Sequence, residues 1–138
     1  MKTTKKPMTD AQKQLAAAKR RAAAERLEKK FRTMWDVCNM EMPFLEMLLC
    51  REHRPWTETK HRIDFAHLRT KVAIEIEGGI WTEGRHTRGE GFEADCLKYN
   101  RLTMEGWAVI RLTSSMLDCK TVTQVRDFIL SRRKTLSA

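Results

Sequence analysis

Residues 62–79, RIDFAHLRTKVAIEIEGG, contain two short segments in which apolar and polar side chains alternate. Apolar side chains stand at every second position: Ile63, Phe65, Val72, Ile74 and Ile76. Asp64, Glu75 and Glu77 lie at the intervening positions. A period of two belongs to β-strands with two different faces, and a short connection between two such strands indicates an antiparallel hairpin over residues 62–77. The chain is therefore expected to form a sheet that is apolar on one face and acidic on the other.

The rest of the chain predicts helices around this hairpin. Thr9 and Gln12 form a capping-box pattern at the start of a helix that should run from about Asp10 to about Cys38. The further elements expected are a short helix over 43–50, a glycine-rich loop over 78–91, a helix over 92–106, a strand over 107–113 and a last helix from about Thr121. This order predicts an α/β fold with a basic N-terminal helical arm, residues 1–41, and a core, residues 42–138.

The net charge of +9 is concentrated near the N-terminus. Residues 1–33 hold 11 Lys and Arg against 3 Asp and Glu, so eight of the nine net positive charges lie there. Lys19, Arg20 and Arg21 are consecutive within this arm. Large apolar side chains recur at helical spacing only in the second half of the predicted helix, so that half should dock and the first half should project. Such an arm is expected to contact phosphates, and a solvated helix or a dimerisation helix is the alternative.

Three carboxylates on one face of a hairpin would repel one another and raise some of their pKa values. A basic neighbour or a divalent cation would relieve this repulsion, and hard oxygen ligands suit Mg²⁺ or Mn²⁺. Taken alone, Glu75 and Glu77 also fit the simpler interpretation of two surface glutamates on a half-exposed strand.

The run RIDFA…KVAIEIEGGIWTEGRHTRGEGFEADCLKYNRLTMEGWAVIRLT resembles the PD-(D/E)XK nuclease superfamily. More narrowly, it is similar to small phage and bacterial nucleases that share a branch with very-short-patch-repair-type endonucleases. The resemblance covers roughly residues 44–118 and joins four motifs in order: an Asp strand, an acidic Gly-Gly strand, the GRHTRG loop and the D-x-x-K-Y-N helix. It implies a restriction-endonuclease-like mixed β-sheet flanked by helices, and a DNA endonuclease that depends on Mg²⁺ or Mn²⁺.

The resemblance also implies roles for individual residues. Asp64 and Glu75 match the metal-binding acids, Ile76 would offer its backbone carbonyl to the metal, and Glu46 matches an acidic position that often completes such sites. Glu77 stands where the superfamily has lysine. Lys98 on the following helix is the expected substitute, and it would orient the attacking water or stabilise developing charge.

The glycine-rich loop supplies candidate DNA-binding residues close to the carboxylates. Arg85 and Arg88 are expected to bind the scissile phosphate, and His86 is a candidate acid or base near neutral pH. Trp81 is expected to stack on an unpaired base or to wedge a duplex.

The sequence therefore predicts a metal-dependent DNA endonuclease, acting on branched or otherwise structured DNA in phage replication, recombination or repair. One alternative is a catalytically inactive DNA-binding or adaptor protein with a nuclease-like fold, which Glu77 favours. An α-helical interaction protein is the other, although the arm lacks sustained leucine heptads. Cutting both strands at one place favours a homodimer.

The chain has no apolar run of about 18 residues and no CxxC pairing. We therefore expect no membrane association and a location in the cytoplasm of a bacterial or phage-infected cell.

Overall fold

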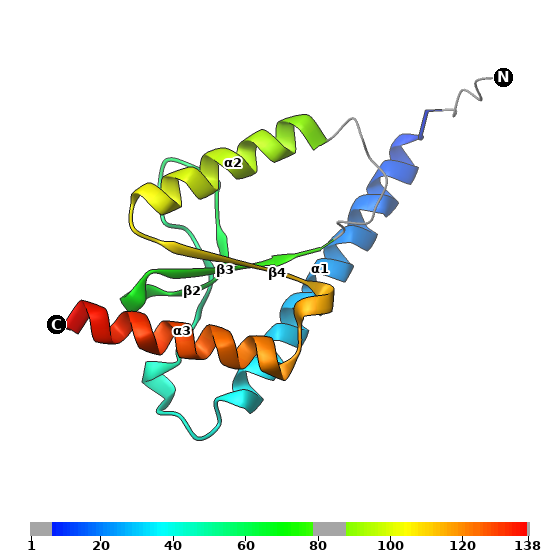
Figure 1. The fold of residues 1–138 in the computed structure, drawn as a ribbon. Coiled ribbons are helices and arrows are strands. Elements are labelled where there is room, and N and C mark those ends of the chain that lie inside the picture. The colour runs from blue at the N-terminus through cyan, green and yellow to red at the C-terminus, as the bar shows by residue number, and fades with distance from the viewer. Residues whose placement is uncertain (1–6, 79–87, 138) are drawn as a thin grey trace.

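The computed structural model describes residues 7–78 and 88–137 (Figure 1). The helices are α1 (Asp10–Cys38), α2 (Arg88–Met104) and α3 (Cys119–Ser137), the strands are β1 (Cys50–His53), β2 (Ile63–His67), β3 (Val72–Glu77) and β4 (Ala108–Thr113), and short 3₁₀ helices cover Phe44–Glu46, Leu68–Thr70 and Ser114–Met116. The strands form one sheet in the order β1-β2-β3-β4, in which β1, β2 and β3 are antiparallel and β4 is parallel to β3. The predicted mixed sheet flanked by helices is thus observed.

The two faces of the sheet pack against different helices (Figure 1). On one face, side chains of α1 and α3 meet those of the sheet in the larger core cluster: Phe31, Trp35, Phe65, Val72, Ile74, Leu112, Val122, Val125 and Ile129. On the other face, Leu102 and Tyr99 of α2 pack with a smaller cluster: Trp56, Ile63, Ala66, Ala73, Trp107 and Val109. Because both faces are covered, β3 is buried on its acidic side as well as on its apolar side.

The predicted hairpin is confirmed. Phe65 pairs with Ile74 and His67 with Val72, and the turn between the strands ends at Lys71 with a φ of 50°. Ile63 departs from the predicted pattern, because it is buried in the cluster under α2 and not in the cluster that contains Phe65.

The N-terminal helix is also confirmed, with the bounds Asp10–Cys38 and the capping box at Thr9. Its first half is exposed, and its second half buries Phe31 and Trp35 against the sheet. The indole nitrogen of Trp35 donates a hydrogen bond of 2.9 Å to the carbonyl of Met47, which secures the segment after the helix. The docked half is therefore part of the protein's main core.

Four details of the prediction are wrong. The helix expected over 92–106 is α2, Arg88–Met104, so its first turn takes residues that were predicted to belong to the glycine-rich loop. The edge strand β1 was not predicted, because its four residues, CREH, show no apolar alternation. The expected helix over 43–50 is a single 3₁₀ turn, Phe44–Glu46. The last helix begins two residues before Thr121, because Asp118 Oδ1 accepts a 2.7 Å hydrogen bond from the Thr121 backbone and so caps the helix.

Within the part of the chain that the structure describes, no helix is long and apolar enough to cross a membrane. Cys38, Cys50, Cys96 and Cys119 are all free thiols.

Replacing Phe31, which is fully buried, should test whether the docked half of α1 belongs to the core. We expect Phe31→Ala to lower the free energy of unfolding by about 3–5 kcal/mol, because it leaves a cavity between α1 and the sheet. Leu15→Ala on the exposed half of the same helix should change it by only about 0.5 kcal/mol. Urea denaturation measures both, and equal effects of the two substitutions would contradict the docking of this helix.

Candidate active site

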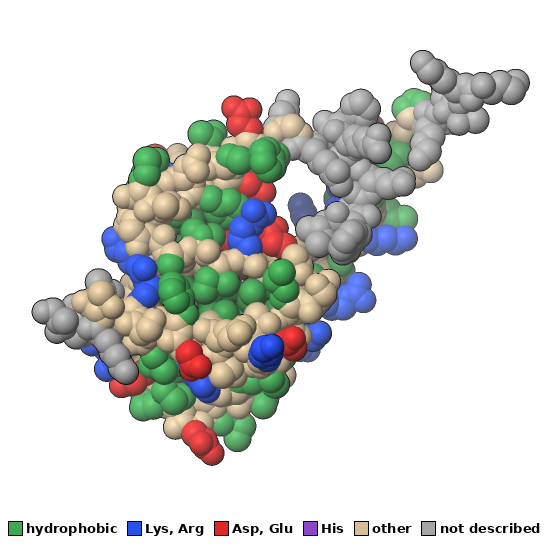
Figure 2. Space-filling view, viewed as in Figure 1, with side chains coloured by type: hydrophobic (Ala, Val, Ile, Leu, Met, Phe, Trp, Pro, Cys, Tyr) green, Lys and Arg blue, Asp and Glu red, His purple; other side chains and the backbone are tan. Residues whose placement is uncertain are grey.

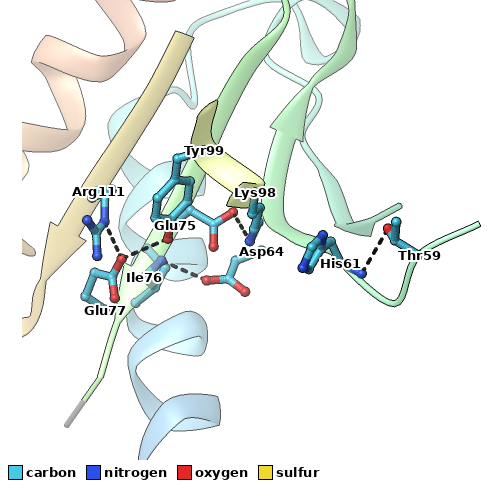
Figure 3. A network of polar contacts seen from close by, with 9 residues as sticks. All are labelled: Thr59, His61, Asp64, Glu75, Ile76, Glu77, Lys98, Tyr99 and Arg111. Carbon is cyan, nitrogen blue, oxygen red and sulfur yellow. Dashed lines mark hydrogen bonds and ion pairs between the residues drawn. The ribbon is translucent and has the colours of Figure 1, made fainter. Parts of the chain in front are cut away.

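The structure brings together the three carboxylates of the hairpin, on the face of the sheet that α2 covers. Because Phe65 pairs with Ile74 in antiparallel register, Asp64 lies across from Glu75. Figure 3 shows these side chains with Lys98 and Tyr99 of α2 and Arg111 of β4. The acidic face of the hairpin is therefore a polar cluster that α2 partly covers.

Asp64 connects the two strands of the hairpin. Its Oδ2 accepts a 2.8 Å hydrogen bond from the backbone N–H of Ile76. Burial raises the pKa of Asp64, the Ile76 N–H and the Lys98 ammonium oppose this, and the carboxylate of Glu28 adds to the rise. The backbone of Ile76 thus contributes to the cluster through its N–H group, while the predicted contact of its carbonyl with a metal stays a prediction.

Glu75 and Lys98 form a buried ion pair beneath α2. The Lys98 ammonium donates to Glu75 Oε1 at 2.8 Å, and the side chains of Lys98 and Glu75 are 10% and 8% exposed. Burial raises the pKa of Glu75 to about 7 against the opposing effect of Lys98, with further increases from Asp64 and Glu77. Lys98 therefore lies beside the acid of β3, and its expected role in orienting water stays a prediction.

Glu77 has partners of its own. Its Oε1 accepts hydrogen bonds from Arg111 Nε at 2.6 Å and from the Tyr99 hydroxyl at 3.2 Å. Burial and the neighbouring carboxylates of Glu75 and Glu77 raise the pKa of Tyr99, so its hydroxyl stays protonated and donates. A lysine at position 77 would face a guanidinium, and this explains in physical terms why the position carries an acid here.

Arg111 and Glu28 belong to this neighbourhood although the sequence did not single them out. Arg111 is the one charged residue in WAVIRLT, and this break in an apolar strand is the signal that could have indicated it. Glu28 lies on the docked half of α1, where its buried carboxylate pairs with Arg51 of β1 at 3.0 Å. No sequence pattern links Glu28 to Asp64, because only the packing of α1 on the sheet brings them near.

Glu46, by contrast, is not brought to the cluster. Its carboxylate pairs with Arg133 of α3 at 2.7 Å, and its carbonyl oxygen lies 3.0 Å from Nε2 of His67. His67 lies at the opposite end of β2 from Asp64. The prediction that Glu46 completes a metal site is therefore wrong, because the turn that carries it packs against the other end of the sheet.

Some predicted DNA-binding residues and the predicted catalytic residue His86 lie outside the described residues. Trp81, Arg85 and His86 belong to the segment 79–87, and Arg88 is described only as the first residue of α2. Lys19, Arg20 and Arg21 lie on the exposed half of α1, as expected of a projecting basic surface.

Two carboxylates fit one type of metal site. Among the described residues, no group of three or more His, Cys, Asp or Glu side chains is arranged to hold a metal ion. Mg²⁺, however, is often bound by only one or two carboxylates, with water and substrate phosphate as its other ligands. Asp64 Oδ1 and Glu75 Oε2 accept no hydrogen bond from any residue that the structure describes, so each carboxylate keeps an oxygen for a cation.

Comparisons of the chain with protein-family models, curated proteins and solved structures give no match. The mixed α/β sheet is therefore a finding of the structure, and membership of the nuclease superfamily stays a prediction from the order of the motifs.

The raised pKa of Glu75 predicts how stability depends on pH without metal. Between the ordinary value of 4.5 and about 7, the folded protein holds a proton that the unfolded chain has lost, so stability falls as pH rises through this window. The loss from Glu75 should approach about 3 kcal/mol by pH 8. In EDTA, Glu75→Gln should therefore show a flatter decline of unfolding free energy between pH 5 and pH 8 than the wild type.

The same substitution at Glu93, an exposed glutamate of α2, serves as the control and should leave the wild-type pH dependence intact. Mg²⁺ should flatten the wild-type curve, because a bound cation favours the ionised carboxylate. Parallel curves for the wild type and Glu75→Gln would contradict the buried, proton-binding state of Glu75.

Proposed function

We propose that the protein is a metal-dependent endonuclease that hydrolyses phosphodiester bonds in DNA, in the cytoplasm of a bacterial or phage-infected cell. The observation that supports this most is that Asp64 and Glu75 lie side by side, with Lys98 paired to Glu75. Each of the two acids keeps one oxygen that accepts no hydrogen bond from the described residues. Two acids that can hold a metal and a lysine beside them can together stabilise the charge that develops in this hydrolysis.

Each of these groups has a chemical role in the proposed reaction. Asp64 and Glu75 would hold Mg²⁺ or Mn²⁺, which when bound neutralises phosphate charge and lowers the pKa of a coordinated water. The Ile76 N–H fixes the Asp64 carboxylate, so it need not reorient when the cation binds. Lys98 is fixed by Glu75 and has further N–H donors that would orient the attacking water or stabilise charge developing on the phosphate.

Helix α1 links this site to a basic surface. Its docked part contacts β3, and Leu27 lies next to Gly78 just beyond the end of that strand. Figure 2 shows Lys and Arg beside Asp and Glu in a hollow beneath α2, with further basic side chains along α1. A DNA backbone that enters the hollow is therefore expected to continue along the exposed half of α1, where Lys19, Arg20 and Arg21 lie.

A DNA-binding or adaptor protein without catalysis is the second candidate. Glu77 favours it, because the strand lacks the lysine of the superfamily pattern and uses its acid to hold Arg111. Both candidates predict DNA binding through α1, and only the endonuclease predicts a Mg²⁺-dependent cut. If both strands are cut at one place, a homodimer would supply the two active sites.

Substitution of the paired acids should test the proposed function directly. We expect Asp64→Asn and Glu75→Gln to abolish Mg²⁺-dependent nicking of supercoiled plasmid, because each removes a carboxylate from the cation site. Lys98→Met should slow nicking by about two to three orders of magnitude, the scale of one lost charge-stabilising group. Glu46→Gln, at the other end of the sheet, is the matched control and should cut at the wild-type rate.

EDTA should stop all cutting by the wild-type protein. Wild-type nicking by Asp64→Asn or Glu75→Gln would contradict the proposed site. A wild-type protein that binds DNA but never nicks it would favour the adaptor instead.

The basic half of α1 makes a separate prediction about DNA affinity. Replacing Lys19, Arg20 and Arg21 together by Gln should weaken DNA binding and reduce the slope of log affinity against log salt by about 2–3, because fewer counterions are released. Lys120→Gln, an exposed lysine on α3, is the control and should leave the slope unchanged. Fluorescence anisotropy over a salt series measures both, and an unchanged slope in the triple variant would show that this part of α1 does not touch phosphate.

A further inference from the structure

We propose that Arg111 is a second phosphate-binding residue of this site and that Glu77 is the residue that positions it. The inference rests on the proposed function and extends it, because it assigns a contact to the DNA backbone beyond the bond that is cut. Arg111 would bind the phosphate next to the scissile one, on the opposite side of Glu75 from Lys98.

The guanidinium of Arg111 is held on two sides. Its Nε donates to Glu77 Oε1 at 2.6 Å, and its central carbon lies 4.7 Å from the centre of the Tyr99 ring. The Tyr99 hydroxyl donates to the same Glu77 oxygen, so the three side chains fix one another. A guanidinium that is already oriented loses little conformational entropy when it binds a ligand.

The two terminal nitrogens of Arg111 are left for a ligand. Neither donates a hydrogen bond to any residue in the described part of the chain, and the side chain is 50% exposed. A planar pair of N–H donors matches the oxygens of a phosphate, which it can bind in a bidentate manner.

Arg101 shows what a purely structural arginine looks like in this protein. It also lies over an aromatic ring, with its central carbon 4.3 Å from the centre of the Trp56 ring. Its Nε donates to Glu105 at 3.0 Å, but one of its terminal nitrogens is also paired, with Glu58 at 2.7 Å. Among the described residues, Arg101 thus has carboxylates on both its inner and its outer nitrogens, whereas Arg111 has one on the inner nitrogen alone.

The position of Arg111 agrees with a role beside the metal site. In the parallel pairing of β3 with β4, Arg111 is the register partner of Glu75. Figure 3 shows Arg111 on one side of Glu75 and Lys98 with Asp64 on the other. A nucleic-acid strand presents phosphates in succession, so one held between Asp64 and Lys98 would place a neighbour toward Arg111.

The test separates phosphate binding from simple neutralisation of Glu77. Fluorescence anisotropy of a labelled random-sequence DNA duplex, in EDTA over a NaCl series, is measured for the wild type and for Arg111→Gln, Glu77→Ala, the double variant and Arg101→Gln. We expect Arg111→Gln to bind about tenfold more weakly, with a salt slope smaller by about one. The double variant, which has the same net charge as the wild type, should stay equally weak, and Arg101→Gln should bind like the wild type. Glu77→Ala removes the acceptor that orients Arg111, so it should bind more weakly than the wild type although it removes a negative charge.

Kinetics give a second readout. Because Arg111 would hold a phosphate that does not react, Arg111→Gln should raise KM for Mg²⁺-dependent nicking more than it lowers kcat. If Arg111→Gln does not fold, as judged by thermal unfolding, Arg111→Lys takes its place and should still bind more weakly than the wild type, since it keeps the charge but loses the planar donor pair.

Wild-type affinity in the double variant would overturn the inference, since Arg111 would then serve only to neutralise Glu77. An equal loss in Arg101→Gln would overturn it as well, because the effect would not be local. In either case, nicking by the wild type would leave the proposed function intact. A wild type that neither binds nor nicks DNA would overturn both.

Discussion

The buried ion pair between Glu75 and Lys98 determines much of how the rest of the molecule is arranged. Removing a carboxylate and an ammonium from water is costly, and their attraction returns only part of that cost. Two apolar residues of similar size would stabilise the contact between α2 and β3 at least as well. The pair is therefore better explained by the groups that it places at the site: a carboxylate whose raised pKa a bound cation would lower, and an ammonium fixed beside it.

Placement of this pair requires a sheet that is covered on both sides. The helices α1 and α3 bury the apolar face of β3, and this supplies the main core of the protein. The other face can then include acids, because α2 brings Lys98 and Tyr99 to them, while Leu102 and its neighbours complete a smaller core near the C-terminal end of the helix. The parts of α2 therefore differ in role, because its C-terminal end packs against the sheet and its middle supplies polar groups.

The sequence predicted those parts of the fold that depend on local patterns. The hairpin and α1 follow from alternation, capping and apolar spacing, which are properties of neighbouring residues. β1 was missed because an edge strand of four mostly polar residues has no such pattern. Glu46 was misplaced, and Glu28 and Arg111 were not recognised, because their neighbours come from segments far away in the chain. The structure places Lys98 beside Glu75, while the catalytic role that the resemblance implies for Lys98 stays a prediction.

The charges of the covered face suggest why Glu77 is an acid. The face holds three carboxylates, those of Asp64, Glu75 and Glu77, and two cations, Lys98 and Arg111. When all five groups are ionised, the face therefore has a net charge of one negative. A divalent cation on Asp64 and Glu75 would change this net charge to one positive, which is equal and opposite to the charge of one phosphodiester group. With lysine at position 77 the same face would already be positive before any cation arrived, and Arg111 would lose the partner that orients it. In the proposed site, Glu77 therefore favours cation binding and directs an arginine toward the substrate at the same time.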